Sequence, residues 1–540
     1  MMVMSLPWYH KTTIYQIYPR SFMDSNGDGI GDLQGIIQKL DYLRDLGFET
    51  IWVSPFFASP QQDFGYDVSD YLSIAPEFGN MDDALQLIEE THRRGMRIVF
   101  DLVLDHTSDQ HPWFLESRSS RGNPKADWYL WKDKPNNWHS MTGGSGWHYA
   151  EERGQFYWAS FLPFQPDLNW RNPEVKQTMF DTARFWLSKG VDGYRLDIFN
   201  TIYKDAGFRD NPFSWKLVPT PDDTSGYFQK TVHSQDQPES FELAREFRKL
   251  TGEFGEVLTI GEVAARRGVL RRYAGEVVND GLTLVFDFEM LQFKFRAEYF
   301  RALVEKIEAH FPPPFMPVYV FCNLDKRRSF HRLGNDLQKA KILAMLQFTA
   351  RGVPCVYYGE EIGMTNLKLP FKTALDPIPR KYTFAPRFIF DWLDVTVNRD
   401  EVRTPMQWDG TRNAGFSSAE KTWLPVHPNY AEVNVENETR DEDSLLNTFK
   451  RLLKFRRENE AMQAGSLEFL GGLPPNVLGF TRGSRAVLLN FDEREKELQI
   501  EFSGCVFKLT GREEIKEKAV RLNGFGGVVL SSKDDPFSAQ

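Results

Sequence analysis

Short apolar segments that alternate with amphipathic ones constrain the fold of this chain more than any other feature. Most of the apolar segments are followed by residues with the periodicity of an amphipathic helix, as at 33–47 and 82–95. Strands that alternate with helices pair in parallel, because a parallel neighbour is reached only through a crossover connection. Eight segments have the length and the β-branched or aromatic content of strands, at 13–18, 50–53, 97–102, 193–197, 259–262, 282–286, 318–321 and 353–357.

Eight such strands favour a closed (β/α)8 barrel, although the pattern alone also admits an open doubly wound sheet. Residues 105–173 interrupt the alternation with a segment rich in aromatic residues, Gly, Pro and Asn, which is too long for a connecting loop. From about Gly465 onward, short segments of alternating polarity predict a small β domain. We therefore expect an α/β fold, with the barrel formed by 1–104 and 174–463, an inserted domain at 105–173 and a β domain at 464–540.

Charge and cysteine content exclude several classes of protein. The 540 residues carry a formal net charge of −10 without a block of Lys and Arg, which argues against a nucleic-acid partner. No stretch approaches 18 apolar residues, and the N-terminus lacks the pattern of a signal peptide. The odd number of cysteines (Cys322, Cys355 and Cys505) argues against a disulfide framework. We expect a cytoplasmic protein with no membrane partner, as a monomer or a small homo-oligomer.

Charged residues stand at the ends of several predicted strands. In Gly-Tyr-Arg195-Leu-Asp197 the Arg and the Asp are two residues apart, so both side chains lie on the same face of a strand. In a barrel that face is the interior, and chemistry occurs at the carboxyl ends of the strands. Arg195 favours the ionised form of Asp197, which suits a nucleophile. The alternative is a buried ion pair with a purely structural role.

Three other predicted strands end in polar residues. Glu262 ends the fifth, Asp325 follows the seventh, and Asp105 and His106 follow the third. A Glu at a strand end is often only solvent-exposed, and a single histidine is usually structural. Four polar strand ends in one predicted barrel are stronger evidence, because the barrel brings them to one face.

The segments that carry these residues resemble those of a known family. DLVLDHTS, GYRLDIFN, TIGEV and NLDKRRS occur in this order and resemble the four short regions of glycoside hydrolase family 13, the α-amylase family. QPDLN at 165–169, RTPMQWD at 403–409 and Gly65-Tyr66-Asp67 resemble its oligo-1,6-glucosidase and α-glucosidase branch. The likeness extends from about Tyr15 to Trp423. It implies a TIM barrel with a domain B after the third strand and a C-terminal antiparallel β-sandwich.

The resemblance implies a retaining mechanism. Asp197 would be the nucleophile, Glu262 the general acid and base, and Asp325 a ligand of sugar hydroxyls that supports the transition state. A retaining glycosidase needs one carboxyl group of low pKa and one of raised pKa, about 5–5.5 Å apart.

The resemblance also implies a set of substrate-binding residues. Arg195 would orient Asp197, Asp67 and Arg403 would hold hydroxyls at the closed end of a pocket, and His106 would bind the terminal glucose. Tyr66 is the candidate for stacking on the sugar, and Gln165 belongs to the same set. The substrate would be a small α-glucoside.

Two positions depart from the family pattern. Leu324 stands where the family has His before the last catalytic Asp. Leucine donates no hydrogen bond, so this change costs on the order of 1–3 kcal/mol, or roughly 10- to 100-fold in rate. Asp105 stands where the family usually has Asn, and the sequence does not explain that substitution.

Residues 24–32, DSNGDGIGD, form an oxygen-rich loop. Its start resembles an EF-hand, but the twelfth position is Gly35 rather than Glu, so it is not one. In the α-glucosidase branch, the loop resembles a site for structural Ca²⁺ or Mg²⁺, and no organic cofactor is implied. The alternative is a solvated acidic turn. The implied ligands are Asp24, Asn26, Asp28, the Ile30 carbonyl oxygen and Asp32.

Three functions stay open. The first is an exo-acting α-glucosidase that hydrolyses terminal non-reducing glucose from short oligosaccharides or α-glucosides. The second is a transglucosylase or a sucrose or maltose isomerase on the same scaffold, and the aliphatic Ile198 after the nucleophile leans towards α-1,6 linkages or transfer. The third is a non-catalytic barrel similar to the ectodomain of amino-acid-transporter heavy chains. The three carboxylates and the lack of an anchor argue against it.

Overall fold

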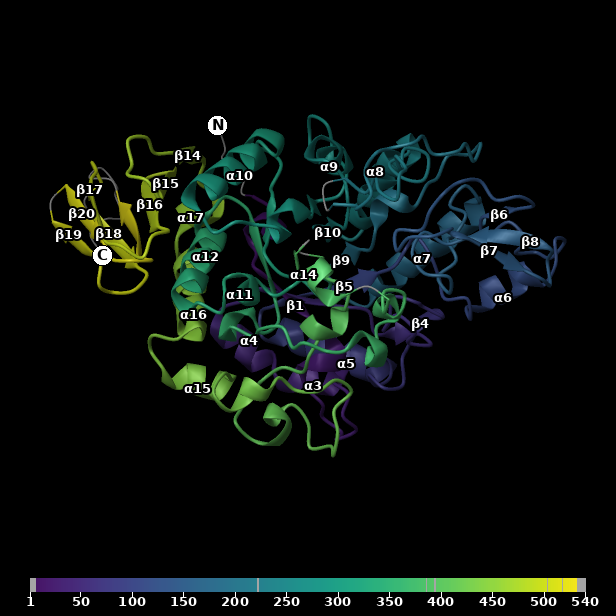
Figure 1. The fold of residues 1–540 in the computed structure, drawn as a ribbon, viewed down its shortest axis with the longest axis horizontal. Helices are drawn as coiled ribbons and strands as arrows, with labels where there is room; N and C mark the ends of the chain where they lie inside the picture. Colours follow the sequence, from purple (N-terminus) through teal and green to yellow (C-terminus); the bar gives the residue numbers. More distant parts are fainter. Residues whose placement is uncertain are drawn as a thin grey trace.

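Eight parallel strands form the centre of the molecule (Figure 1). The computed structural model describes residues 6–220, 223–384, 386–392, 395–502, 504–516 and 518–531. The strand order is β11-β10-β9-β5-β2-β1-β13-β12, and a parallel bridge between Phe286 and Val318 joins the two outer strands. The predicted (β/α)8 barrel is therefore confirmed. Its strands are β1 (Ile14–Ile17), β2 (Thr50–Val53), β5 (Arg97–Leu102), β9 (Gly193–Leu196), β10 (Leu258–Gly261), β11 (Leu284–Val285), β12 (Val318–Val320) and β13 (Val353–Tyr357).

Alternate residues of these strands fill the barrel interior. Val99 of β5 and both Leu258 and Ile260 of β10 belong to one buried apolar cluster. Because side chains alternate between the two faces of a strand, the next inward positions are Asp101 on β5 and Glu262 after β10. The interior thus changes from apolar to charged toward the carboxyl ends of the strands.

Amphipathic helices cover the outside of the barrel. The segment expected as one helix at 33–47 is two, which meet at Lys39. In α12, every residue from Ala340 to Thr349 is buried, because this helix packs between the barrel, α16 and the C-terminal sheet (Figure 1). The main helices are α3 (Leu33–Gln38), α4 (Leu40–Leu46), α5 (Met81–Arg93), α7 (Pro173–Ser188), α8 (Pro238–Gly252), α9 (Arg267–Ala274), α10 (Ala297–His310), α12 (Leu337–Thr349), α16 (Leu445–Glu458) and α17 (Glu460–Ala464).

The insertion after β5 contains α6 (Pro112–Ser119) and a small antiparallel sheet in the order β6-β8-β7. These strands are β6 (Trp131–Lys132), β7 (Trp147–Ala150) and β8 (Gln155–Trp158). Trp138, Trp147 and Trp158 form a buried cluster within it. Many of the aromatic residues in this part of the sequence therefore build the core of domain B.

The C-terminal part consists of two antiparallel sheets that share one apolar core. The larger has the order β14-β15-β16-β21-β18 and the smaller β17-β20-β19. Leu488 of β16 and Leu498 of β17 lie in the same buried cluster, as expected for a sandwich. The first five and last nine residues of the ranges predicted for the terminal domains lie outside the described residues. The strands are β14 (Leu467–Phe469), β15 (Val477–Arg482), β16 (Arg485–Asn490), β17 (Lys496–Gln499), β18 (Gly504–Lys508), β19 (Glu514–Lys516), β20 (Ala519–Leu522) and β21 (Gly527–Ser531).

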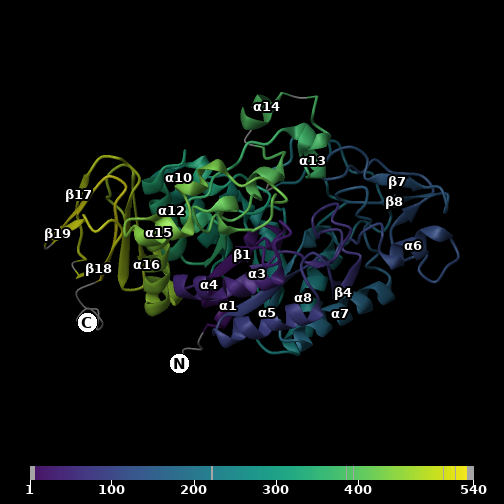
Figure 2. The same ribbon diagram turned by 90° about the horizontal axis from the view of Figure 1, so that it is seen from below.

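Domain B and the C-terminal sandwich lie at opposite ends of the molecule, with the barrel between them (Figure 2). Two long connections, 197–237 after β9 and 358–434 after β13, extend from the carboxyl ends of their strands. The second carries α13 (Pro377–Arg380) and α14 (Arg387–Trp392), which project above the barrel in Figure 2. These connections and domain B surround the carboxyl ends of the barrel strands.

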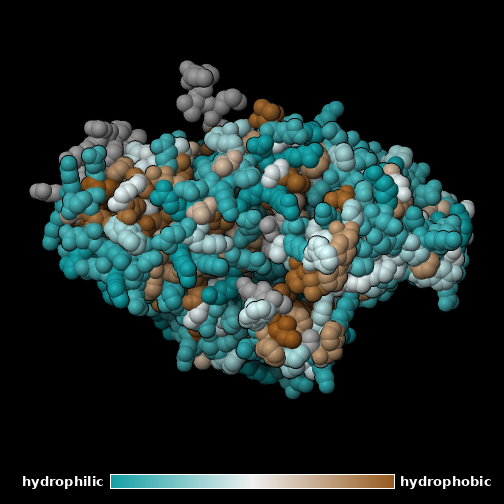
Figure 3. All heavy atoms as spheres, turned by 45° about the horizontal axis from the view of Figure 1, so that its top comes forward, coloured by the Kyte–Doolittle hydropathy of each residue, from teal (hydrophilic) through white to brown (hydrophobic). Residues whose placement is uncertain are grey.

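The surface shown in Figure 3 is mainly hydrophilic, with separate hydrophobic patches. No helix in the described part of the chain has the length and apolar character needed to cross a membrane. The three cysteines are unpaired, and two of them, Cys322 and Cys355, are buried in the barrel. This agrees with the prediction that no disulfide framework holds the fold.

Candidate active site

Arg195 joins three carboxylates at the carboxyl ends of adjacent strands. Its Nη1 donates to Oδ1 of Asp197 at 2.7 Å and to both oxygens of Asp101 at 2.8 and 2.9 Å, while Nη2 donates to Glu262. The Arg195 side chain is 3% exposed, so these charges meet away from water. Arg195 and Asp197 thus share a face, as predicted, and Glu262 from the next strand reaches the same guanidinium group.

Asp101 belongs to this cluster, although the sequence analysis did not select it as a site residue. Its Oδ2 accepts hydrogen bonds from Trp52 Nε1 and from the Tyr66 hydroxyl, each at 3.2 Å. Burial raises the pKa of Asp101 to about 6, although Arg195 opposes the rise. Strand alternation carries the missing signal, because Asp101 follows the inward-facing Val99 by two residues and lies in register with Arg195.

The backbone turns sharply after Asp197. Ile198 has φ of 29° and ψ of 50°, a conformation that β-branched residues rarely adopt. Its N–H donates to Oε2 of Glu262 at 3.3 Å, and the N–H of Phe199 donates to the carbonyl oxygen of Glu262 at 2.8 Å. Backbone strain of this kind persists where the surroundings hold it, often at functional sites.

Burial raises the pKa of both Asp197 and Glu262. For Glu262 the value rises to about 8, since burial and the charges of Asp197 and Asp325 outweigh the attraction of Arg195. The expectation of a low pKa for Asp197 is wrong for the free protein, because burial outweighs Arg195 there as well. Glu262 is therefore protonated at neutral pH, as a general acid must be.

Asp325 follows β12 and pairs with arginines of the connection after β13. Its Oδ1 lies 2.7 Å from Nη2 of Arg403 and 3.6 Å from Nη1 of Arg399. Against burial, Arg403 and then Arg399 hold the pKa of Asp325 below its ordinary value. The Asp325 side chain is 33% exposed, so the carboxylate remains accessible to a ligand.

Leu324, beside Asp325, is 1% exposed and belongs to the main apolar core. Its carbonyl oxygen accepts a hydrogen bond from Nε of Arg403 at 2.9 Å. The backbone at this position therefore helps to fix Arg403. The apolar side chain supplies no hydrogen-bond donor.

Asp67 is buried and held by its own loop. It accepts hydrogen bonds from Ser59 Oγ and from the N–H groups of Gln62 and Asp63, at 2.9 to 3.0 Å. Burial raises the pKa of Asp67 to about 6. Arg403, which is expected to hold hydroxyls at the same end of the pocket, pairs with Asp325.

Tyr66, next to Asp67, packs against the carboxylate cluster. Its hydroxyl contacts Asp101, and its ring lies under the Arg195 guanidinium, 5.6 Å from the ring centroid. The ring is 6% exposed. In this structure Tyr66 therefore supports Arg195, and the stacking on glucose expected from the sequence stays a prediction.

His106 and Gln165 lie together where domain B meets the barrel. His106 Nε2 lies 3.2 Å from the carbonyl oxygen of Tyr66 and 3.3 Å from Nε2 of Gln165. Gln165 also donates to Oδ2 of Asp63 at 3.1 Å. The structure thus brings these two predicted site residues into contact.

Asp63 continues this network into the connection after β13. Its Oδ1 lies 2.5 Å from Nη2 of Arg399, which also pairs with Asp376 at 2.9 Å. All three side chains are almost fully buried. One ion-pair bridge, absent from the sequence prediction, therefore ties the loop after β2 to the connection after β13.

The oxygen-rich loop lies between α2 (Pro19–Phe22) and α3. Asp24, Asn26 and Asp28 each accept a hydrogen bond from the N–H two residues further on, at 3.1, 2.9 and 2.8 Å. Asp32 accepts from Ser25 and caps α3. Within the described residues, no three His, Cys, Asp or Glu side chains form a group that could hold a metal.

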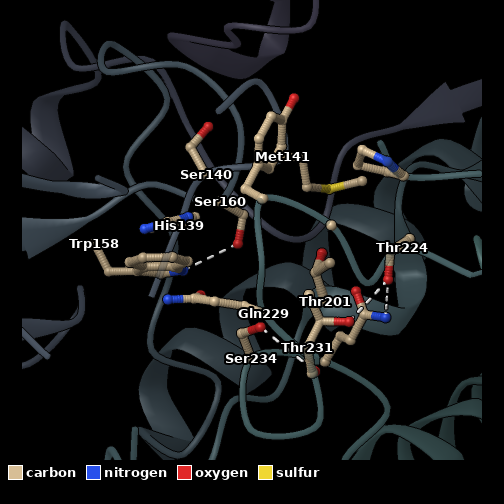
Figure 4. A pocket seen from close by; sticks show the side chains of 14 residues that line it. His139, Ser140, Met141, Trp158, Ser160, Thr201, Thr224, Gln229, Thr231 and Ser234 are labelled. Carbon is tan, nitrogen blue, oxygen red and sulfur yellow. Dashed lines mark hydrogen bonds between the residues drawn. The ribbon is translucent and has the colours of Figure 1, made fainter. Parts of the chain in front are cut away.

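A cavity lies between domain B and the connection after β9 (Figure 4). Its empty volume is about 510 Å³, part of which is open to solvent. None of its 14 lining residues is Asp, Glu, Lys or Arg. Thr201 ends the short helix that begins two residues after Asp197, so the cavity adjoins the segment after the carboxylate cluster. Its wall includes Trp158, Thr201, Thr224, Tyr227, Gln229 and Gln235.

Proteins similar to this chain include named α-glucosidases and an α-glucosyl transfer enzyme. The chain is 38% identical to a protein of Rhizobium meliloti (strain 1021) named "Probable alpha-glucosidase", over 96% of this chain and 93% of the relative. It is 36% identical to the oligo-1,6-glucosidase of Parageobacillus thermoglucosidasius, over 90% and 91%. Among solved structures, the α-glucosyl transfer enzyme XgtA is similar with a TM-score of 0.89 and 36% identity, over 98% of this chain and 100% of that one.

A family model agrees with these relatives and with the sequence motifs. The model described as "Alpha amylase, catalytic domain" matches residues 16–465, which include the end of β1, the other seven barrel strands, domain B and the four carboxylates Asp101, Asp197, Glu262 and Asp325. The chain therefore belongs to the α-amylase family of glycoside hydrolases, within its group of oligo-1,6-glucosidases and α-glucosidases.

Proposed function

We propose that this chain is a retaining, exo-acting α-glucosidase that hydrolyses terminal non-reducing α-linked glucose from short oligosaccharides or α-glucosides. The observation that carries the proposal is the contact of one buried guanidinium group, that of Arg195, with both Asp197 and Glu262. These two carboxyl groups stand on adjacent strands of the barrel, at the end where active sites of this architecture occur.

The two carboxyl groups would act in two steps. In the first, protonated Glu262 gives its proton to the glycosidic oxygen while Asp197 attacks the anomeric carbon, so the old bond breaks and a glucosyl ester forms. In the second, ionised Glu262 takes a proton from water, which attacks the same carbon and releases Asp197. Two inversions give net retention. The raised pKa of Glu262, about 8, provides the proton for the first step.

The arginine network beside Asp325 supports recognition of one terminal sugar. Arg403 and Arg399 keep Asp325 ionised, and a partly exposed carboxylate suits two sugar hydroxyls. The buried bridge from Asp63 through Arg399 to Asp376 fixes two segments of the chain beside them. These segments would close one end of the site, which would then admit a chain terminus but exclude a continuing polysaccharide.

The cavity in Figure 4 is a candidate site for the leaving group, which would be a sugar or another neutral polar group. It adjoins the segment after Asp197 and is lined by hydroxyl, amide and aromatic groups without a charged side chain. Such a wall offers hydrogen bonds and ring faces to a polyol but no counter-ion to a charged aglycone.

Transfer to an acceptor hydroxyl is the second candidate function. The similarity to an α-glucosyl transfer enzyme favours it, and the chemistry differs only in the group that Glu262 deprotonates in the second step. Product analysis separates the two functions, since maltose, isomaltose and sucrose yield free glucose with a hydrolase and new disaccharides with a transferase. A non-catalytic role is disfavoured by the complete carboxylate cluster.

A structural Ca²⁺ or Mg²⁺ in the loop 24–32 is part of the proposal. Asp24, Asn26 and Asp28 supply side-chain oxygens at alternate positions of the loop, and hard cations prefer oxygen ligands. The cation would stabilise this loop and take no part in the chemistry. Its test is thermal unfolding with and without a chelator, in the wild type and in Asp28→Ala. The chelator should lower the Tm of the wild type alone.

We also place the protein in the cytoplasm, as a monomer or a small homo-oligomer. Three unpaired cysteines suit a reducing compartment. Fractionation of the source cells, followed by size-exclusion chromatography of the native enzyme, tests both statements. Activity in the periplasmic or extracellular fraction would contradict the first.

A further inference from the structure

Four ionisable side chains are buried together where β5 ends: Asp105, His106, Asp167 and Lys204. None is more than 2% exposed. A backbone bridge between His106 and Asp167 fixes domain B against the end of β5, and Lys204 approaches from the connection after β9. The proposed mechanism leaves Asp105 and Lys204 without a role.

The charges of this cluster do not balance without an additional proton. Lys204 Nζ lies 2.7 Å from Oδ1 of Asp105 and also pairs with Oδ2 of Asp167. With both carboxylates ionised and a neutral imidazole, the cluster would carry one net negative charge. An uncompensated buried charge is costly, so we expect one more proton, either on Asp167 or on His106.

The hydrogen-bond partners of Asp167 leave no place for that proton. Its Oδ1 accepts from the N–H of Ser160 at 2.7 Å, and its Oδ2 accepts from the Ser160 hydroxyl at 2.6 Å as well as from Lys204. The Ser160 oxygen already accepts from Trp158 Nε1 at 3.0 Å, so its own proton is directed at Asp167. Every neighbour is a donor, which favours an ionised carboxylate.

The partners of His106 have the opposite character. Nδ1 lies 3.4 Å from Oδ2 of Asp105, and Nε2 lies 3.2 Å from the carbonyl oxygen of Tyr66. The amide of Gln165 directs one N–H to Oδ2 of Asp63, and its nitrogen also lies 3.3 Å from Nε2 of His106. Each ring nitrogen thus has an acceptor within reach, and the doubly protonated imidazolium can donate to both.

We propose that Asp105 is a positioning residue that keeps His106 doubly protonated, so that the glucose pocket presents a fixed positive charge to Asp197. The carboxylates that face His106 are Asp105 on its own segment, Asp167 from domain B and Asp197 after β9. The link to Asp197 rests on the proposed function, whereas the protonation state of His106 does not.

The direction of the pKa change of His106 agrees with this arrangement, whereas burial raises the pKa of Asp167 to about 7, against the donors that surround that carboxylate. Against burial, the hydrogen bond and charge of Asp105 raise the pKa of His106. The charge of His106 in turn opposes the effect of burial on Asp197 and favours its ionised form. Asp105 therefore acts on the nucleophile through the histidine.

Asp105→Asn should favour a neutral His106 while the shape of the side chain at position 105 is kept. Its carbonyl oxygen can accept from Lys204, which leaves the amide N–H groups to face Nδ1 of His106. A donor at that place favours a neutral imidazole. The cluster then stays balanced, with Asp167 and Lys204 as the remaining charges.

Nitrogen NMR of histidine-labelled protein tests the protonation state, with the His106 signal assigned by its loss in His106→Gln. In the wild type we expect His106 to be doubly protonated at pH 7, and in Asp105→Asn its pKa should fall by about one unit or more. A neutral His106 in the wild type overturns the proposal whether or not the variant folds. An equal titration in both proteins overturns the role of Asp105.

The pH profile of kcat/KM tests the effect on Asp197. In Asp105→Asn the acid limb should move to higher pH, since Asp197 loses a nearby positive charge. The matched control is Asp205→Asn, which removes a carboxylate one residue from Lys204 that pairs with the surface residue Arg209. An equal loss of activity at every pH, with an unmoved limb, would overturn the link to Asp197. If no α-glucoside is turned over by the wild type, the NMR result still decides the state of His106.

Discussion

The backbone N–H of Ile198 donates to the Glu262 carboxyl group at 3.3 Å. The residue after the proposed nucleophile thus holds the proposed acid in place. Arg195, two residues before that nucleophile, donates to the same Oε2 atom. The carboxyl group of Glu262 is therefore positioned by the strand that carries Asp197, and a shift of that strand disturbs both reactive groups.

Glu262→Gln should abolish proton donation while the fold is kept. We expect kcat on maltose or isomaltose to fall by about 10²- to 10⁴-fold. With an activated leaving group, such as p-nitrophenol, the first step needs little acid assistance and the loss should be smaller. Azide should restore turnover and give an α-glucosyl azide, since it needs no general base. Glu253→Gln, on the surface beside Arg184, is the matched control and should keep full activity.

The activity should fall as the pH rises through about 8. The folded protein raises the pKa of Glu262 to about 8, and only the protonated form can start the reaction. The alkaline limb of kcat/KM therefore reports Glu262. The raised pKa of Glu262 also affects stability. Its contribution to the unfolding free energy is fully present below the ordinary pKa of a glutamate and is lost as the pH rises to about 8. The difference in unfolding free energy between Glu262→Gln and wild type should thus increase with pH.

The barrel and its reactive carboxylates are predictable from sequence because each rests on a local pattern. Strand alternation places Arg195 and Asp197 on one face, and apolar runs define all eight strands. Asp101 obeys the same rule, but its role depends on its register with Arg195 across two strands. The sequence of one strand does not reveal how that strand aligns with another strand that lies far away in the chain.

The remaining parts of the site depend on contacts that no local pattern encodes. Arg399 meets Asp63 across 336 positions of the chain, and Asp105 finds Lys204 across 99. The raised pKa of Asp197 is not predictable from the sequence for a related reason. The sequence shows Arg195 beside it but does not show how completely the neighbouring segments bury the carboxylate.

Leu324→His should increase activity on α-glucosides. Leu324 adjoins Asp325, and a histidine there adds a donor beside this partly exposed carboxylate. We expect kcat/KM to rise roughly 10- to 100-fold, as for a hydrogen bond of 1–3 kcal/mol. Leu324→Met keeps a similar volume without a strong donor and serves as control. Unchanged or lower kcat/KM in the histidine variant, with an intact fold, would count against this role.

Arg399→Met should destabilise the protein and loosen substrate recognition. The change leaves Asp63 and Asp376 buried without their cation, which costs on the order of 3–5 kcal/mol of unfolding free energy. KM should rise more than kcat falls, because Arg399 also helps to hold Asp325. Urea unfolding and steady-state kinetics measure the two effects. Arg440→Met removes an exposed ion pair with Glu436 and should change neither.

Mass spectrometry of a trapped intermediate tests double displacement at Asp197 most directly. A fluorinated α-glucosyl donor that forms the ester quickly and hydrolyses it slowly should label the enzyme at one site, and digestion should place the label on Asp197. The released sugar of an ordinary substrate should appear first as the α-anomer. A label on another side chain, or β-glucose as the first product, would contradict a mechanism in which Asp197 attacks and Glu262 serves as acid and then base.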